Sequence, residues 1–293
     1  MDISVIIPSK NRSVELRRML ATIAAQTMPP HEVIIVDQSA GADEAACRAL
    51  LPGIKVIYIH DPRITGLTMA RNRGIRCASG GILAFVDDDE LLEPDYLAEL
   101  QAAYEAHPDA NGVSGVVTNY QRPPLSFRLW YRISHLGPFF DVRQPLYWRA
   151  QTERFDAIPV SRLGGGVMSF RKQVFSELRF DENLSGGCFG EDVDFSARVG
   201  KLFITGKARL CHKHSASERS GDHWLQLTVR SNCYLAHSLG WKGPSYYWCM
   251  AFCWLSCAGL SLLNRSRQPL RLFYAGRDDA RKDLQPKTNS SAL

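Results

Sequence analysis

Short apolar runs alternate with amphipathic segments through the first third of the chain. Residues 14–23, 42–51 and 67–77 place apolar side chains at the spacing of one helix face. Apolar runs of strand length lie between them, at residues 3–7, 33–36, 56–59 and 82–86. This alternation predicts an α/β fold: a single Rossmann-like domain with a mostly parallel sheet, right-handed crossovers and flanking helices.

A polar side chain follows each of these predicted strands: Ser9, Asp37, Asp61 and Asp87. In open parallel sheets ligands bind beyond the carboxyl ends of the strands, so we expect these side chains to line a ligand site. The turn after the first strand is not glycine-rich, and no G-x-x-x-x-G-K-[ST] loop occurs. A bound nucleotide would therefore need a metal and basic side chains to neutralise its phosphates.

The fourth strand runs directly into four acids, Asp87, Asp88, Asp89 and Glu90. On an extended backbone alternate side chains share a face, so Asp87 and Asp89 are expected to point the same way. Two carboxylates held that close repel each other unless a cation lies between them, and a hard divalent cation prefers oxygen ligands. The alternative is an acidic cap of the helix that residues 93–95 open.

Two later segments carry further candidate chemistry. Glu191 and Asp192 lie at a predicted helix start, where they serve either as first-turn acids or as a general base. Residues 208–214 are predicted to form a short strand with His212 and His214 on one face. Such a pair is either a metal contact or two ordinary polar side chains.

Residues 120–163 show no regular period and are rich in Pro, Arg and aromatic side chains. A structureless stretch of that length inside a compact domain is usually a functional loop or lid, with a loop merely packed on the surface as the alternative. The glycines at 164–166 are predicted to turn the chain into a strand. They either let a ligand approach the backbone closely or simply form the turn.

The net charge of +5 comes from the end of the chain. Residues 1–241 hold equal numbers of basic and acidic side chains, whereas residues 242–293 hold eight basic and three acidic ones. This distribution argues against a nucleic-acid-binding surface.

The eight cysteines include no C-x-x-C pair, which is typical of a reduced cytosolic compartment. The start of the chain leads directly into a strand, so no signal peptide is expected.

Residues 244–263 carry no charge, are rich in aromatic side chains and are long enough to span a bilayer. Lys242 precedes the segment and Arg265 and Arg267 follow it. Basic residues on both sides disfavour moving the tail across a membrane. We expect an interfacial or re-entrant helix pair on an anionic cytoplasmic leaflet, with a buried helix that closes the fold as the alternative.

Several short motifs occur in a defined order, at residues 5–12, 36–37, 70–74, 85–89, 190–192 and 212. Their sequences are Val-Ile-Ile-Pro-Ser-Lys-Asn-Arg, Val-Asp, Ala-Arg-Asn-Arg-Gly, Phe-Val-Asp-Asp-Asp, Gly-Glu-Asp and a single His. Together they resemble the family 2 glycosyltransferases. The resemblance implies a GT-A fold over residues 1–222, with a nucleotide-binding half (1–118) and an acceptor-binding half (119–222). Residues 223–293 would then form a helical, membrane-associating extension.

The resemblance also implies a role for each matching residue. The residues that would bind the nucleotide sugar are Pro8, Ser9, Arg12, Asp37, Asp61, Arg71, Asn72, Asp87 and Asp88. The ligands of a Mg²⁺ or Mn²⁺ ion on the diphosphate would be Asp87, Asp89 and His212, with His214 as the alternative to His212. Asp192 would be the general base that deprotonates the acceptor hydroxyl, supported by Glu191.

We therefore expect a metal-dependent, inverting glycosyltransferase that moves a sugar from a nucleotide-diphosphate sugar to the hydroxyl of a saccharide or lipid-linked saccharide. It would serve cell-surface polysaccharide or glycolipid synthesis at the cytoplasmic face of the membrane, without a nucleic-acid partner. The alternatives are a polyprenyl-phosphate sugar transferase, whose anionic acceptor needs no base, and a non-catalytic nucleotide-sugar-binding protein. Gln38 and Ser39 depart from the family pattern, and a short connection at 198–202 bears on the choice of histidine.

Overall fold

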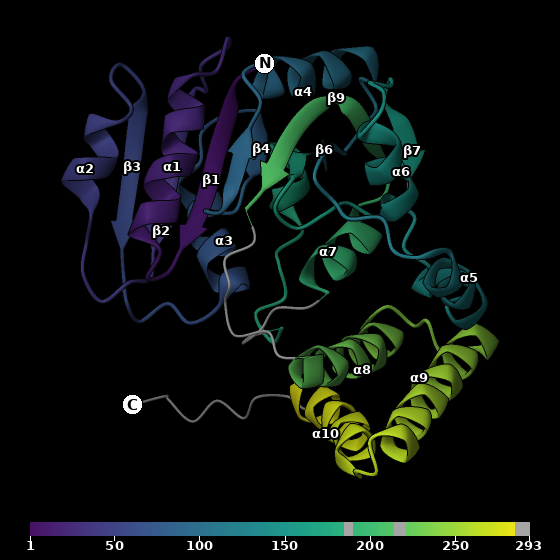
Figure 1. Ribbon diagram of the computed structural model, residues 1–293. Coiled ribbons are helices and arrows are strands. Elements are labelled where there is room, and N and C mark those ends of the chain that lie inside the picture. Colours follow the sequence, from purple (N-terminus) through teal and green to yellow (C-terminus); the bar gives the residue numbers. More distant parts are fainter. Residues whose placement is uncertain (185–189, 214–220, 285–293) are drawn as a thin grey trace. The chain divides into compact units, whose positions relative to one another are not determined.

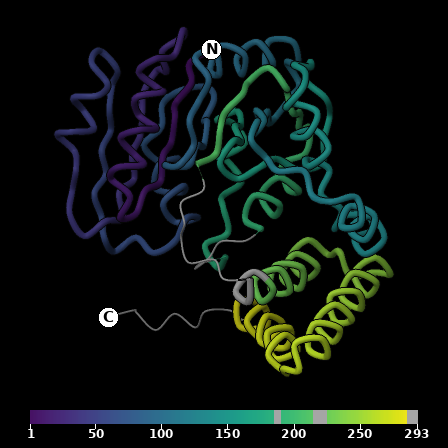
Figure 2. The backbone as a smooth tube through the Cα atoms, viewed as in Figure 1, coloured from purple at the N-terminus to yellow at the C-terminus, as the bar shows by residue number. Residues whose placement is uncertain are grey.

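The computed structural model describes residues 1–184, 190–213 and 221–284, so His214 lies outside the described residues. The chain divides into two compact units (Figures 1 and 2). Unit 1 comprises Met1–Arg122 and Val142–Ser215, and unit 2 comprises Pro123–Asp141 and Ala216–Leu293. Part of the segment that the sequence assigns to the acceptor-binding half therefore groups with the C-terminal helices.

Within the described residues, unit 1 is built on one nine-stranded sheet, in the order β3-β2-β1-β4-β8-β6-β9-β5 with β7 beside β9. The strands are β1 (Ile3–Ser9), β2 (Glu32–Asp37), β3 (Lys55–His60), β4 (Ile82–Phe85), β5 (Glu90–Leu92), β6 (Gly112–Val117), β7 (Ile158–Val160), β8 (Met168–Arg171) and β9 (Leu202–His212). The first four strands are parallel, as expected. Beyond them the sheet is mixed, because β8 runs antiparallel to β4 and β6.

Helices flank this sheet and confirm the α/β fold (Figure 1). They are α1 (Ser13–Ala24), α2 (Glu44–Ala49), α3 (Leu67–Cys77), α4 (Tyr96–Ala106), α6 (Arg143–Ala150), α7 (Glu191–Val199) and the 3₁₀ helix η2 (Lys172–Ser176). In α1 four side chains of the predicted stripe are buried, Leu16, Met19, Leu20 and Ile23, whereas its first member, Val14, is exposed. The 3.6-residue period thus decides which face of the helix packs on the sheet.

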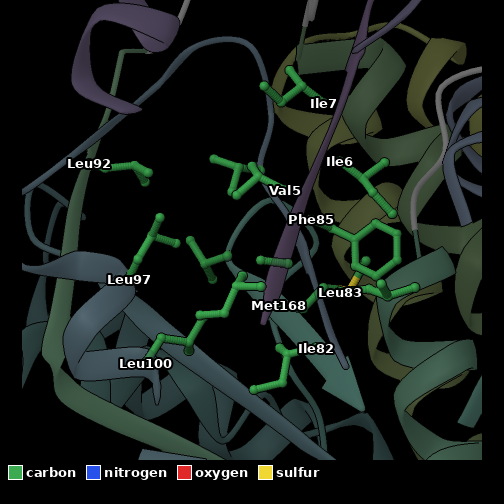
Figure 3. Packing of buried hydrophobic residues seen from close by; sticks show 14 of the residues in the cluster. Val5, Ile6, Ile7, Ile82, Leu83, Phe85, Leu92, Leu97, Leu100 and Met168 are labelled. Atoms are coloured by element: carbon green, nitrogen blue, oxygen red, sulfur yellow. The ribbon is translucent and has the colours of Figure 1, made fainter. Parts of the chain in front are cut away.

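The core lies between the sheet and its helices. Every residue of β1 is buried, as is usual for a strand inside a covered parallel sheet. Figure 3 shows side chains of β1 and β4 near Met168 of β8 and near Leu97 and Leu100 of α4. The rings of Phe180 and Phe195 stack with centroids 4.3 Å apart, which ties α7 to the segment that precedes it. This packing fixes β1 and β4, and the acids at their carboxyl ends are therefore attached to the core.

Residues 120–163 are not structureless, contrary to expectation. They contain α5 (Leu125–Ser134), the 3₁₀ helix η1 (Gly137–Phe139), α6 and β7. Leu125, Leu129 and Ile133 lie four residues apart, a helical spacing that the intervening arginines and aromatic residues obscure. The strand predicted at 208–214 is also longer, because β9 begins at Leu202 and bends through a change of register along β6.

Unit 2 contains α5, η1, α8 (Gly221–Ser238), α9 (Pro244–Leu263) and α10 (Gln268–Asp283). Residues 244–263 therefore form one continuous helix, and the expected interfacial or re-entrant helix pair on a membrane stays a prediction. The buried residues of α9 are Cys249, Met250, Cys253 and Cys257, which share one face. Among the described helices, α9 is long and apolar enough to cross a membrane, and 17% of its 18-residue apolar window is buried.

Candidate functional site

Asp88 and Asp89 lie in a turn after β4, and Glu90 begins the next strand, β5. β4 ends at Phe85, and the amide of Glu90 donates to the carbonyl of Asp87 at 3.3 Å, which closes a turn over Asp88 and Asp89. The expectation that Asp87 and Asp89 share a face through strand alternation is wrong, because that alternation holds only for an extended backbone. Asp88 and Asp89 instead reach one common partner, and Asp87 reaches another.

Arg12 binds both acids of the turn through a single nitrogen. Its Nη1 lies 3.1 Å from Asp88 Oδ1 and 3.1 Å from Asp89 Oδ2. At the end of β1, Ser9 Oγ donates to Asp88 Oδ2 at 2.7 Å. Burial outweighs these favourable contacts and raises the pKa of Asp88 to about 6. The structure thus brings together three residues of the predicted nucleotide-sugar site.

His212 faces the same turn from β9. β5 and β9 pair antiparallel with Glu90 opposite His212, and this register places His212 Nε2 3.2 Å from Asp89 Oδ1. Burial opposes ionisation of Asp89, but the hydrogen bond and charge of His212, with the charge of Arg12, outweigh it and lower the pKa of Asp89. Asp89 is therefore an ionised carboxylate at neutral pH.

This pair fits a divalent cation that substrate also ligates. Mg²⁺ is usually held by one or two carboxylates together with substrate phosphates and water. Within residues 1–184, 190–213 and 221–284, no three His, Cys, Asp or Glu side chains gather in a group that could hold a metal. Asp89 and His212 would accordingly be protein ligands of a metal whose remaining ligands come from the diphosphate and solvent.

Arg71 joins the acids after β4 to the acids of α7. Its guanidinium is fully buried, with Nη1 2.9 Å from Glu191 Oε1 and Nη2 3.2 Å from Asp87 Oδ1. Nη2 also donates to the carbonyl of Gly165 at 2.9 Å. Burial and the neighbouring charge of Asp192 raise the pKa of Glu191 to about 7, although Arg71 acts in the opposite direction. Two motifs from distant parts of the chain thus meet at one cation.

Asp192 forms an ion pair that the sequence did not indicate. Arg143 Nη1, at the start of α6, donates to Asp192 Oδ2 and also to the carbonyl of Leu163 at 2.7 Å. The other carboxylate oxygen accepts the amide of Val193 at 2.9 Å. Arg143 lies in the stretch without regular period, so sequence pattern offered no signal for this partner.

Glu90 is a second residue whose role the sequence left open. It is 3% exposed, and burial together with the charges of Asp87 and Asp89 raises its pKa well above the ordinary value. Gly166 lies against it: a Cβ at Gly166 would come within 2.4 Å of Glu90 Oε1 and 2.8 Å of Asp87 Oδ2. The glycine turn predicted at 164–166 therefore permits the backbone to approach these two acids closely.

A pocket of about 240 Å³ opens beside the ends of β1 and β2. Its lining includes Ser9, Asn11, Asp37, Ser39, Gly41 and Asp43. Asp37 Oδ1 accepts the amide of Ser39 at 2.9 Å, and Asp37 Oδ2 accepts the hydroxyl of Tyr58 from β3. Burial and this hydrogen bond raise the pKa of Tyr58, so the phenol stays a donor that orients Asp37. The alternation of side chains along β3 could have indicated Tyr58.

The other predicted residues have partners within the protein. Asp61 Oδ1 accepts from Arg63 Nε at 2.9 Å near the surface. Asn72 is buried, and its Nδ2 donates to the carbonyl of Phe180 and to Glu182 Oε1, each at 2.9 Å. Pro8 lies inside β1 opposite Val36. Asn72 thereby anchors the segment before α7, and contact of these three residues with a nucleotide sugar stays a prediction.

Comparison with known proteins agrees with this arrangement. The family model "Glycosyl transferase family 2" matches residues 4–179 of the chain. An uncharacterized glycosyltransferase of Bacillus subtilis, YwdF, is 34% identical over 147 residues, which are 49% of this chain and 53% of that protein. The O-antigen biosynthesis protein RfbC of Myxococcus xanthus is 28% identical over 283 residues, which cover 84% of this chain and 20% of that protein. The chain therefore spans about half or less of these curated relatives.

A solved structure shares the fold. It is the mannosyltransferase PcManGT from Pyrobaculum calidifontis in complex with GDP-Man and Mn²⁺, with a TM-score of 0.56 at 17% identity. The similarity covers 97% of this chain and 87% of that one. A mixed α/β sheet flanked by helices, as in the GT-A glycosyltransferases, is thus the architecture that positions the acids described above.

Proposed function

Because this chain belongs to glycosyl transferase family 2, we propose that it transfers a sugar from a nucleotide-diphosphate sugar to the hydroxyl of an acceptor. The observation that carries the proposal is the buried Arg71, which contacts both Asp87 and Glu191. Donor binding and proton transfer each require an acid, and the two acids must lie on opposite sides of the reacting sugar. The Arg71 guanidinium fixes the acids after β4 and the acids at the start of α7 relative to each other.

The donor would bind along the carboxyl ends of β1, β2 and β4. The pocket at Asp37 has a carboxylate that Tyr58 orients, which suits the hydrogen-bond donors of a nucleotide base. Asp88, held by Ser9 and Arg12, lies next along this edge and would contact the ribose or the sugar. Open parallel sheets bind ligands at this edge.

Asp89 and His212 would hold a Mg²⁺ or Mn²⁺ ion on the diphosphate, whereas Asp87, the third ligand that the family resemblance implies, forms an ion pair with Arg71 in this structure. When bound, such an ion stabilises the negative charge that develops on the leaving group. Asp89 suits this task because its pKa is lowered, so it is ionised without the metal. The Mn²⁺ in the complex of the Pyrobaculum mannosyltransferase supports the choice of ion.

Asp192 would act as the general base. The acceptor oxygen attacks the anomeric carbon, the bond from that carbon to the diphosphate oxygen breaks with its electron pair leaving on the diphosphate, and the acceptor proton passes to Asp192. A direct displacement of this kind inverts the anomeric centre. Glu191 is held by Arg71 and would instead position the start of α7, while Arg143 aims the Asp192 carboxylate.

The acceptor would be a saccharide or lipid-linked saccharide in cell-surface polysaccharide or glycolipid synthesis. The likeness to a Myxococcus O-antigen biosynthesis protein supports this setting. The apolar helix α9 supports contact with the cytoplasmic face of a membrane, where such acceptors are built. An acceptor phosphate in place of the hydroxyl would need no base, and the presence of Asp192 beside Glu191 favours the hydroxyl.

The test is transfer and slow donor hydrolysis with a panel of nucleotide sugars and Mn²⁺. Asp192→Asn should abolish transfer and leave donor affinity nearly unchanged, whereas Asp89→Ala should weaken donor binding only when metal is present. The control is Asp109→Asn, which removes an exposed carboxylate in the loop between α4 and β6 and should change neither transfer nor donor binding. Turnover that survives both substitutions would contradict the catalytic assignment, and donor binding without turnover would indicate a binding protein.

A further inference from the structure

The helix α9 has two opposite faces, and both are apolar. The face with Cys249 and Cys253 is buried inside unit 2. On the other side Tyr247, Leu255 and Leu262 are 68%, 56% and 80% exposed. Residues at this spacing form one stripe along a helix, and twenty residues extend about 30 Å. A soluble monomer rarely exposes a continuous apolar surface of this length.

The helix α5 adds a second exposed apolar stripe to unit 2. Leu125, Leu129 and Ile133 recur every four residues and are 61%, 54% and 56% exposed. Trp248 Nε1 of α9 donates to the carbonyl of Ile133 at 2.7 Å. The two stripes therefore belong to neighbouring helices of one unit, and the sequence alone did not indicate α5 as part of this surface.

A groove of about 450 Å³ lies where α9 turns into α10. Trp254, Leu262 and Leu270 form its apolar wall, and Ser261, Arg265 and Arg267 also line it. The hydroxyl of Ser261 has no hydrogen-bond partner among the described residues. Two guanidinium groups and a hydroxyl beside an apolar wall suit a phosphate group that carries an acyl chain.

The charges of unit 2 separate into paired and unpaired groups. Neither Arg265 nor Arg267 forms an ion pair with a carboxylate within the part of the chain that the structure describes. By contrast, three basic side chains of α8 and α10 have acidic partners: Arg230 with Asp283 at 2.6 Å, Arg281 with Asp278 at 3.4 Å and Lys282 with Asp279 at 3.6 Å. Arg265 and Arg267, which have no such partner among the described residues, therefore place positive charge beside the apolar wall of the groove.

Arg265 also adopts a backbone conformation that favours glycine. Its φ of 48° lies in the left-handed region, one residue beyond the C-cap of α9. A side chain other than glycine is strained in that region. Such a conformation at the rim of a groove is often retained because the side chain has a function there.

The contacts of α9 with its neighbouring helices bear on how it can lie relative to a bilayer. Its buried face contacts α8, where Tyr246 Oη donates to Cys233 Sγ at 3.7 Å. α8 in turn packs against α10, where Gln226 Nε2 donates to Asp279 Oδ2 at 2.7 Å. If α9 crossed a bilayer with these contacts intact, the charged residues of α10 would enter the hydrocarbon, which is strongly unfavourable. The packed unit is compatible with α9 lying in the plane of the surface.

We propose that unit 2 docks on a bilayer that contains anionic phospholipid. α5 and α9 lie in its interface with their exposed stripes facing the acyl chains, and the groove at the α9–α10 turn receives a phosphate headgroup between Arg265 and Arg267. Tryptophan and leucine on one side with unpaired arginines nearby complement an anionic interface. This surface extends the membrane contact suggested above and is independent of the transfer chemistry.

The test is co-sedimentation of the full chain with vesicles of phosphatidylcholine alone or with added phosphatidylglycerol. The protein should bind the anionic vesicles, and salt should weaken binding. Arg265→Gly with Arg267→Gln should weaken it roughly 30-fold, since each cation near such a surface contributes about fivefold. Arg281→Gln with Lys282→Gln removes the same charge from paired side chains and should change binding less than about twofold. Leu129→Gln should weaken binding to both kinds of vesicle.

Three results would overturn this proposal. The first is an equal loss of vesicle binding in the two double variants. The second is that the protein resists extraction from membranes at alkaline pH, which would indicate a spanning helix. The third is a concentration-dependent dimer that forms through α5 and α9 without vesicle binding. Arg265→Gly removes the positive-φ strain, so this half of the double variant is not expected to destabilise unit 2. Donor hydrolysis measured without vesicles should be unchanged in every variant, which separates failure of this surface from failure of the transferase function.

Discussion

Arg71 Nη1 lies 2.9 Å from Glu191 Oε1, although the two residues are 120 positions apart in the sequence. Arg71 is 0% exposed, and its other terminal nitrogen reaches Asp87. A buried cation is stable only where anions surround it, and buried acids likewise need a cation. The acids of α7 and those after β4 are therefore held together by mutual neutralisation.

Arg71→Met should be among the most damaging substitutions in unit 1. It leaves Glu191 buried without its cation, and breaking a buried ion pair in this way costs about 3–5 kcal/mol of unfolding free energy. Denaturant unfolding would measure the loss. The double variant Arg71→Met/Glu191→Gln should recover part of it, because the uncompensated charge is gone. A double variant that is as unstable as the sum of the two single variants would contradict the pairing.

Asp88 should make stability depend on pH. Burial raises its pKa from 3.8 to about 6, so the native state keeps a proton that the unfolded chain has already lost. This group therefore lowers the unfolding free energy as pH rises from about 4 to about 6, by roughly 3 kcal/mol in all. Urea unfolding across that range should show the decline in the native chain. Asp88→Asn should remove this part of the slope, and an unchanged slope would contradict the assignment.

The sequence predicted those parts of the site that strand order determines. Ser9 and Asp37 end neighbouring parallel strands and are opposite each other in the sheet, as their positions after apolar runs indicated. The turn over Asp88 and Asp89 could not be predicted, because an apolar run followed by acids does not show where the extended backbone stops. The ion-pair partner of Asp192 could not be predicted either. Arg143 comes from a segment whose helices have no clear period, and it contacts α7 only in the folded chain.

Arg143→Ala should impair transfer more than donor binding. Arg143 contacts Asp192 and the carbonyl of Leu163, so it fixes the direction of the predicted base. Loss of that orientation should lower the transfer rate by about tenfold to a hundredfold, because catalysis depends on geometry of the reacting groups. Arg143→Lys keeps the charge but not the fork of donors, so its transfer rate should lie between those of Arg143→Ala and the unsubstituted protein. Initial transfer rates and donor affinity should be measured together, and a parallel fall in both would assign Arg143 to the donor site instead.

Gly166→Ala should disrupt the site by steric clash alone, because it adds a methyl group without changing charge. The new methyl group would lie within 2.4 Å of Glu90 Oε1 and 2.8 Å of Asp87 Oδ2, so one or both acids must move. Because Asp87 is a predicted metal ligand, metal-dependent donor binding should weaken by about tenfold or more, as displacing such a group by an ångström commonly does.

The matched control is Gly81→Ala, where a methyl group meets no atom within 4 Å and should leave donor binding unchanged. Calorimetric titration of donor with and without Mn²⁺ distinguishes the cases. If Gly166→Ala weakens binding equally with and without metal, the two acids contact the nucleotide sugar directly. If it has no effect at all, Asp87 and Glu90 lie outside the donor site.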